Sequence, residues 1–127
     1  MELITSKICM ASDIGIHGNL FGGFLMAWID EAAAAYVTQF CETPRMVTLL
    51  VSELMFKMPV KTGNHIKIYG QMISLGKTSA TVKIEVRRLN VETTKEEIIT
   101  TASLKFVRID EHGKAAPISE HVRKKMN

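Results

Sequence analysis

An uninterrupted apolar run long enough to span a membrane is missing from this chain of 127 residues. A spanning helix needs about 18 or more apolar residues, and the best candidate, Phe24 to Tyr36, is interrupted by Asp30 and Glu31. Residues 1–7 also lack the basic and apolar regions of a secretory signal peptide. We therefore expect a cytoplasmic protein without a membrane partner.

Cysteine is scarce as well: Cys9 and Cys41 are the only two, and they are not spaced like a metal site or a redox motif. Two free thiols fit a reducing compartment. A thiol nucleophile paired with His17 or His65 is one alternative, but neither cysteine lies in a recognised nucleophile context. We interpret both as small buried hydrophobic residues, and we expect no metal site.

The excess of positive charge is small, with 16 Lys and Arg against 13 Asp and Glu and a net charge of +3. The chain has no basic run with interleaved aromatic residues, so we expect no nucleic-acid partner. A modest surplus of cations suits a phosphorylated small molecule better. Arg123, Lys124 and Lys125 belong to a C-terminal tail, about residues 111–127, whose basic end we expect to be solvated.

With 46% apolar and 23% charged residues, the chain has the composition of one folded domain, residues 1–127. A helix is predicted from Gly22 to Cys41, because Thr43-Pro44 marks its end. The residues one helical turn from Asp30 are all apolar. Because this segment has no broad polar face, we expect the helix to be buried nearly all round.

Extended segments make up most of the remaining chain. Strands are expected at about residues 2–11, Met46 to Lys57, His65 to Leu75, Ser79 to Arg87 and Ile98 to Ile109. Short links between the last four favour antiparallel hairpins, so we predict an α+β domain in which a four-stranded meander, with an additional N-terminal strand, curls round the helix. The strand from Met46 is apolar on both faces, so we expect it to be covered on both sides. Apolar residues such as Leu50, Leu54 and Phe56 remain on the sheet face away from the helix, which predicts oligomerisation.

A glycine-rich turn, residues 18–23, leads directly into the predicted helix. Backbone N–H groups at a helix start can bind an oxyanion, and Gly22 and Gly23 allow a ligand to approach closely; tight packing of helix on sheet is the alternative reason for this pair. Asp30 can act as a base or nucleophile, unless it merely pairs with a basic neighbour or reaches solvent. Glu31 has the same chemistry.

The other polar candidates also have structural alternatives. Asn19 can orient water or substrate, or it can cap the helix. His17 is interpreted as a loop residue. The hairpin turn Gly76-Lys77-Thr78-Ser79 offers a cation and two hydroxyl groups to a phosphate. Arg87 and Arg88 add cations on the adjoining strand, although a solvated strand face explains them equally well.

Together these residues resemble the hot-dog-fold acyl-CoA thioesterases, the group that contains the bacterial YciA-like enzymes and the cytosolic acyl-CoA hydrolases. The matching residues are Ser12-Asp13, His17-Gly18-Asn19-Leu20-Phe21-Gly22-Gly23, Asp30-Glu31, Val47-Thr48, Phe56, Pro59-Val60, Gly63 and Gly76-Lys77-Thr78-Ser79. The resemblance covers about residues 12–110. Its most diagnostic part is the glycine-rich turn followed seven residues later by Asp30.

The resemblance implies a long helix wrapped by a curved antiparallel sheet, with two sheets joined edge to edge in a dimer and dimers stacked into a hexamer. Active sites lie at the dimer interface in this family. The resemblance makes Asp30 the catalytic carboxylate and Asn19 an amide that orients water or substrate, and these two can come from different subunits. It assigns the amides of Gly22 and Gly23 to the thioester carbonyl. Contacts to coenzyme A are implied for Lys77, Thr78, Ser79, Arg87 and Arg88.

We therefore expect an acyl-CoA thioesterase in which the Gly23 N–H holds the oxyanion. Asp30 either deprotonates a water near Asn19 or attacks through an anhydride. The alternatives are an acyl-CoA-sensing module and a hydroxyacyl-thioester dehydratase. Coenzyme A is part of substrate and product, so no cofactor is expected. The acyl pocket is expected near Trp28, Met55, Phe56 and Met58.

Overall fold

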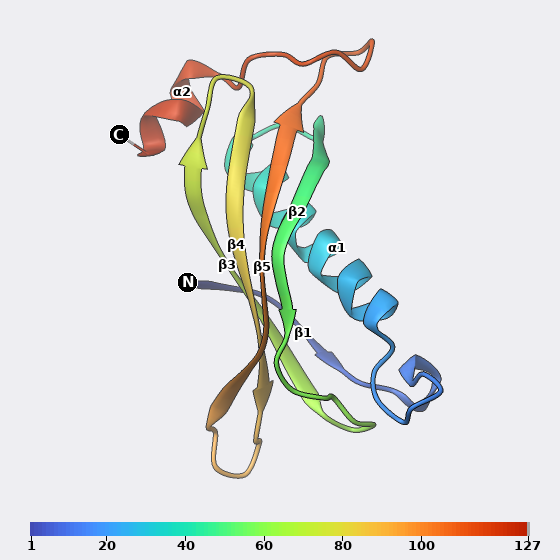
Figure 1. Ribbon diagram of the computed structural model, residues 1–127. Coiled ribbons are helices and arrows are strands. Elements are labelled where there is room, and N and C mark those ends of the chain that lie inside the picture. Colours follow the sequence, from blue (N-terminus) through green and yellow to red (C-terminus); the bar gives the residue numbers. More distant parts are fainter. Residues whose placement is uncertain (127) are drawn as a thin grey trace.

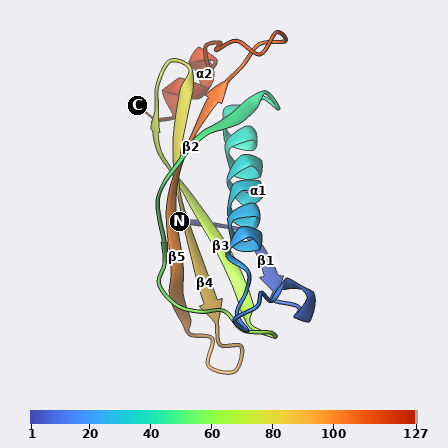
Figure 2. The same ribbon diagram turned by 45° about the vertical axis from the view of Figure 1, so that its right-hand side comes forward.

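The computed structural model describes residues 1–126, so Asn127, the last residue of the expected tail, lies outside the described part. The fold is one antiparallel sheet with a long helix along one face (Figures 1 and 2). Its elements are β1 Glu2–Ile8, the short 3₁₀ turn η1 Ala11–Asp13, α1 Gly22–Cys41, β2 Met46–Phe56, β3 His65–Leu75, β4 Ser79–Leu89, β5 Glu96–Arg108, α2 Glu120–Arg123 and the 3₁₀ turn η2 Lys124–Met126. The α+β prediction is confirmed.

The long helix has the predicted bounds, Gly22 to Cys41. It ends because Glu42 adopts a left-handed conformation with φ 56°, and the Glu42 N–H caps the last turn. At the other end the N-cap residue is Phe21, which has no side-chain capping bond. The alternative interpretation of Asn19 as a helix cap is therefore wrong, because Asn19 lies two residues too early in the chain.

Only one face of α1 is buried in a single chain, so the expectation of burial nearly all round is wrong. Leu25, Ile29, Ala33 and Val37 face the sheet and are at most 4% exposed. Phe24 and Met26, on other sides, are 42% and 44% exposed. Apolar side chains left open in this way indicate a surface that another molecule covers.

The core lies between α1 and the inner face of the sheet. Along β4 the alternation that the sequence shows is observed directly, since Ala80, Val82, Ile84 and Val86 are all fully buried. Their opposite neighbours are polar, and on that outer face Arg87 bonds to Glu85 and stacks over the ring of Tyr69. The outer face is therefore largely polar rather than an apolar docking face.

The strand order is β1-β3-β4-β5-β2, so the predicted four-stranded meander is wrong. The helix carries the chain across the sheet, and β2 pairs with β5 instead of β3. β2 is an edge strand, and it is also not covered on both faces, since Val47, Leu49 and Leu50 are 40%, 62% and 53% exposed.

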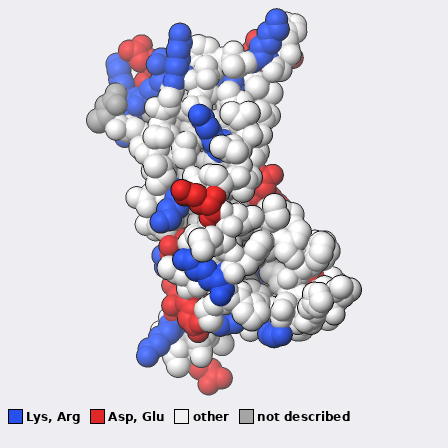
Figure 3. Space-filling model, viewed as in Figure 1, with Lys and Arg blue, Asp and Glu red and all other residues white. Residues whose placement is uncertain are grey.

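Two register shifts in β2 explain where its apolar side chains point. They lie between Thr48 and Leu50 and between Ser52 and Met55, and they reset the alternation of faces. As a result Leu54 and Phe56 line hollows beside α1, contrary to expectation. The exposed apolar surface therefore lies along the β2 edge and around the start of α1. Figure 3 shows few charged side chains over the loop that leads into α1.

The C-terminal segment is docked through apolar residues, while Lys124 and Lys125 at its basic end are exposed, as the sequence predicts. Ile118 and Val122 are fully buried, because α2 packs at the end of α1. Lys125 pairs with Glu42 at 2.8 Å and also donates to the carbonyl of Phe40 at 2.9 Å. Within residues 1–126 no helix is both long and apolar enough to cross a membrane.

Candidate active site

Asp30 of α1 faces the edge strand β2. The hydroxyl of Thr48 donates a hydrogen bond to Oδ1 of Asp30 with an Oγ1–Oδ1 distance of 2.6 Å. Charge-assisted bonds of this kind are short and strong, and they orient the carboxylate. The sequence interpretation did not assign Thr48 a role. The only indication was that Val47-Thr48 is among the residues that carry the family resemblance.

A hollow of about 310 Å³ opens beside this pair. It lies between α1 and β2 and is lined by Gly23, Met26, Ala27, Ile29, Asp30, Thr48, Val51, Leu54 and Leu104. Asp30 and Thr48 supply the polar side chains of this lining, and most other lining residues are aliphatic. A single oriented carboxylate in an apolar hollow suits chemistry at the end of an apolar chain.

The start of α1 carries free backbone donors. The N–H groups of Phe24 and Leu25 both donate to the carbonyl of Phe21, at 3.0 and 3.2 Å. The N–H groups of Gly22 and Gly23 donate to no acceptor within residues 1–126. These orphan groups lie at the positive end of the helix dipole, where an oxyanion is stabilised.

A second hollow, of about 240 Å³, lies on the other side of the helix start. Its lining includes Asn19, Gly22, Phe56 and Met58. The ammonium group of Lys61 donates to Oδ1 of Asn19. Because an ammonium group has no acceptor, this contact assigns the amide oxygen, and the NH₂ end of Asn19 remains to donate to a ligand.

One chain does not bring all of these groups to a single point. Gly23 and Asp30 are seven residues apart on the helix, which is about 10 Å along its axis. Asn19 and Asp30 line different hollows. Reacting groups need to approach within about 3–3.5 Å, and this rise along the helix exceeds that range.

The residues suggested for coenzyme A are also separated. Lys77 to Ser79 form the turn between β3 and β4, whereas Arg87 is eight residues farther along β4, about 26 Å away. Arg87 is held by Glu85 at 2.6 Å. Arg88 donates at 3.1 Å to the carbonyl of Pro59, which lines the second hollow, and Arg88 itself lines a separate hollow with His65.

The remaining candidates lie away from the Asp30 hollow. Glu31 and Trp28 line a separate hollow between α1 and β1. Met55 lines neither hollow beside the helix start, and His17 is exposed on its loop.

Both cysteines behave as the sequence predicts. Cys9 and Cys41 are free and buried, and burial raises the pKa of each thiol, with Asp13 adding to the rise at Cys9. A raised pKa suppresses the thiolate, so neither has the character of a nucleophile. In the part of the chain that the structure describes, three or more potential metal-ligating side chains gather nowhere.

Comparison with known proteins places this geometry among thioesterases. Residues 17–95 match the thioesterase superfamily. The acyl-CoA thioester hydrolase YciA of Escherichia coli K12 is 29% identical over 89% of this chain and 87% of its own. Cj0915 of Campylobacter jejuni, described as a hexameric hotdog fold thioesterase, superimposes with a TM-score of 0.86 at 30% identity, over 98% of this chain and 96% of its own. The hot-dog fold that the sequence predicts is confirmed.

An acyl-CoA hydrolase of Staphylococcus aureus, solved with butyryl coenzyme A, gives a TM-score of 0.85 at 27% identity over 95% of this chain and 76% of its own. Two further structures of that protein carry alanine in place of one asparagine and one aspartate. The asparagine lies 15 residues before the aspartate in its sequence. In the present chain Asn19 is 11 residues before Asp30 (30 − 19), and Gly15 occupies the position 15 residues before it. Gly15 and Asn19 are neighbours across a turn, since the Gly15 N–H donates to the Asn19 carbonyl at 2.8 Å.

Proposed function

This chain belongs to the thioesterase superfamily, and we propose that it hydrolyses the thioester of acyl-CoA to a carboxylic acid and coenzyme A. The observation that carries the proposal is the carboxylate of Asp30, oriented by Thr48 over an apolar hollow next to the start of α1. The relatives whose names state an activity, among them YciA, are acyl-CoA thioester hydrolases.

Hydrolysis of a thioester needs few catalytic groups. Sulfur overlaps poorly with the carbonyl π system and thiolate leaves readily, so oriented donors and one carboxylate suffice. In our proposal the free N–H of Gly23 stabilises the oxyanion. The NH₂ of Asn19 orients water or substrate, and Lys61 holds the Asn19 amide in its donating orientation. Asp30 then activates a water or attacks the carbonyl itself.

We propose that each site is completed by a second subunit. Gly23 and Asp30 are about 10 Å apart along one helix. We therefore propose that the oxyanion donors of one subunit act together with the Asp30 carboxylate of the other. The free edge of β2, with its exposed apolar side chains, is the surface suited to this pairing. Hexameric relatives support an assembly of three such dimers.

The test is thiol release from a panel of acyl-CoA substrates, compared between wild type and Asp30→Asn, which keeps the shape of the side chain. We expect turnover by the wild type and its loss in a folded variant. Cys9 and Cys41 contribute little background to a disulfide reagent, because both are buried with raised pKa values. Tight binding of acyl-CoA without thiol release would instead indicate a sensor.

The same assay addresses the dehydratase alternative. No histidine lines either hollow among the described residues, so a His–acid pair has no support at this site. Enoyl product in place of free coenzyme A would overturn the proposal. Oxygen-18 in the Asp30 carboxylate after a single turnover in labelled water would support the anhydride route, and its absence would count against that route.

We further propose that the protein works in the cytoplasm and needs no cofactor. The two free cysteines fit a reducing compartment. Hydrolysis consumes only water and the thioester, so activity is expected to survive treatment with a chelator. Fractionation of the source cells tests the location.

A further inference from the structure

The loop that leads into α1 contains a closed hairpin. The N–H of Gly18 donates to the carbonyl of Gly15 at 3.1 Å, and the N–H of Gly15 donates to the carbonyl of Asn19 at 2.8 Å. Ile16 and His17 are therefore the central residues of the turn, and Gly18 supplies the left-handed residue that follows it, with φ 79°. These bonds give the tip of the loop one defined backbone conformation.

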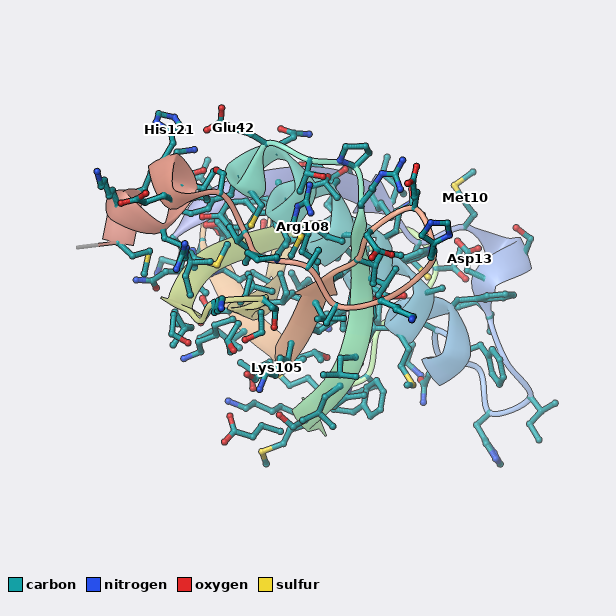
Figure 4. The ribbon with its side chains drawn as sticks, turned by 90° about the horizontal axis from the view of Figure 1, so that it is seen from above. Met10, Asp13, Glu42, Lys105, Arg108 and His121 are labelled. Atoms are coloured by element: carbon teal, nitrogen blue, oxygen red, sulfur yellow. The ribbon has the colours of Figure 1, made fainter. Side chains whose placement is uncertain are left out.

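The hairpin is anchored at its base. The Leu20 N–H donates to the carbonyl of Val60 at 2.7 Å, and the Phe21 N–H donates to the carbonyl of Asp13 at 2.9 Å. Figure 4, in which Asp13 marks the base of the hairpin, shows the tip projecting away from the rest of the ribbon. The position of the tip relative to Asn19 is therefore fixed.

The tip of this hairpin is apolar. Ile16 is 96% exposed, whereas the next most exposed large apolar side chain of the described residues, Leu49, is 62% exposed. Turns of this kind usually carry polar residues. The ring of Phe21 lies next to the hairpin and packs edge to face on Phe24, and both rings are also exposed. An apolar tip that continues into two exposed phenyl rings indicates a surface that another molecule covers.

The hollow beside Asp30 has an apolar rim that is open in a single chain. Met26 and Val51 line the hollow and are 44% and 38% exposed, while Ile29 and Leu104 in the same lining are at most 2% exposed. Asp30 carries the only charge among the residues that line this hollow. An aliphatic side chain packed on the rim would bury apolar surface on both sides and leave the floor of the hollow to a substrate.

A second subunit is the molecule that suits this surface. Because Ile16 is 96% exposed, it does not pack on the hollow of its own chain. In the proposed shared site, Asn19 of one subunit acts with Asp30 of the other. Ile16 lies three residues before Asn19, which is at most about 10 Å along the chain. A docking that brings Asn19 to the partner's carboxylate therefore also brings Ile16 to the partner's hollow.

We propose that Ile16 of one subunit packs against Met26 and Val51 at the rim of the partner subunit's Asp30 hollow. This inference rests on the proposed function, in which two subunits share each site. Ile16 is then a positioning residue, because its contact holds the hairpin that carries Asn19 against the partner's carboxylate.

Cross-linking tests the contact. Ile16→Cys and Met26→Cys chains are unfolded together, refolded in equal amounts and treated with a short bismaleimide. We expect a covalent dimer from this mixture, because the two cysteines face each other in the mixed dimers. The matched control uses Val91→Cys in place of Ile16→Cys and should give none, since Val91 is an aliphatic residue, 54% exposed, in the loop between β4 and β5. Cys9 and Cys41 add little background, because both are buried with raised pKa values.

Two results of this experiment would overturn the proposal. One is a mixture that forms no covalent dimer although a monofunctional maleimide labels both introduced cysteines. The other is an equal yield of covalent dimer from the Val91→Cys control.

Kinetics test the positioning role. We expect kcat for an acyl-CoA to fall about tenfold in Ile16→Ser, since burial of one aliphatic side chain is worth at least that factor, and to be unchanged in Val91→Ser. Ile16→Val keeps an aliphatic side chain and should retain most of kcat. An unchanged kcat in Ile16→Ser, or a loss of the same size in Ile16→Val, would overturn the role.

Mixed chains show whether Ile16 acts across subunits. Ile16→Ser and Asp30→Asn chains, refolded together in equal amounts, should give roughly a quarter of wild-type activity, because half of the dimers then have one intact site. If Ile16 acts only within its own chain, or its loss merely damages the fold of that chain, the mixture gives about a twentieth, and the proposal is wrong.

The cross-link also separates this proposal from the proposed function, because it needs no turnover. If the wild type hydrolyses no thioester, the proposed function fails, while a cross-link between the mixed chains still supports the contact. If hydrolysis proceeds and the mixed chains form no cross-link, the contact is wrong and the function stands.

Discussion

Thr48 of the edge strand β2 donates its hydroxyl hydrogen to Oδ1 of Asp30 in the middle of α1, at 2.6 Å. The bond joins two elements that are 18 residues apart in the chain. It fixes the direction of an exposed carboxylate that packing alone does not hold. The position of β2 thereby becomes part of the site.

Thr48→Val tests this positioning role, because valine keeps the shape and removes the donor. We expect kcat to fall about tenfold, the cost of one hydrogen bond to a charged group. Thr48→Ser keeps the hydroxyl and should retain most of the activity. If Thr48→Val is as active as wild type, Thr48 does not position Asp30.

Gly23 and Gly22 form a matched pair at the helix start. A Cβ on Gly23 would lie 2.7 Å from Cε2 of Phe21, whereas one on Gly22 would lie 3.7 Å from Cζ of Phe56. Gly23→Ala should therefore displace the Phe21 ring and lower kcat, while Gly22→Ala should be nearly neutral. Gly23→Pro carries the same Cβ and in addition removes the proposed oxyanion donor, in a first helical turn that accepts proline, so we expect a loss of about 100-fold beyond that of Gly23→Ala. Steady-state kinetics and circular dichroism distinguish lost catalysis from lost folding.

The amide of Asn19 is tested by moving it across the turn. Asn19→Ala is expected to lower kcat/KM by about 10-fold or more, because the donor that orients water or substrate is lost. Adding Gly15→Asn restores an amide at a neighbouring backbone position, where a Cβ would lie 3.4 Å from Cδ1 of Phe21. We expect partial recovery, and none with Gly15→Ala. Full activity of Asn19→Ala would show that the amide has no role.

Mixing of defective chains tests the shared site. Asp30→Asn and Gly23→Pro chains, unfolded together and refolded in equal amounts, should regain roughly a quarter of wild-type activity, because half of the dimers then have one intact site of two. The control mixes wild type with a chain carrying both substitutions. A shared site predicts roughly a quarter of the activity there too, and a site within one chain predicts about half.

The ion pairs of Glu42 with Lys125 and His121, which join the C-terminal segment to the end of α1, should weaken in acid. Lys125 first, and His121 after it, lower the pKa of Glu42 in the folded protein. Because folding lowers the pKa of Glu42, its ion pairs stabilise the folded protein fully at pH values above the unfolded-state pKa, about 4.3. This stabilisation is lost as the pH falls through the folded-state pKa. Thermal unfolding should show Glu42→Gln less stable than wild type at pH 7, with the difference closing below about pH 4. Glu120→Gln, which loses an exposed pair, should match wild type throughout; a pH-independent difference at Glu42 would contradict the electrostatic origin.

Local patterns were enough to predict much of the fold. The bounds of α1 and β3 agree with the prediction to the residue, because apolar periodicity and the Thr43-Pro44 and Gly76 breaks are local signals. The order of strands could not be read this way. β2 pairs with β5 because α1 ends beside that edge of the sheet. This position depends on tertiary packing and cannot be predicted from a short stretch of sequence.

The sequence by itself determined which chemical groups this protein has and their order along the chain: a glycine pair at a helix start, Asp30 two turns later, and a Lys-Thr-Ser turn. Tertiary structure alone decided which of them meet. It joined Asp30 to Thr48, oriented the Asn19 amide with Lys61, separated Lys77 from Arg87 and bonded Ile118 of the C-terminal segment to Lys77. The reason is physical: helices and strands follow from neighbouring residues, whereas contacts between side chains follow from strand pairing and packing across the whole chain.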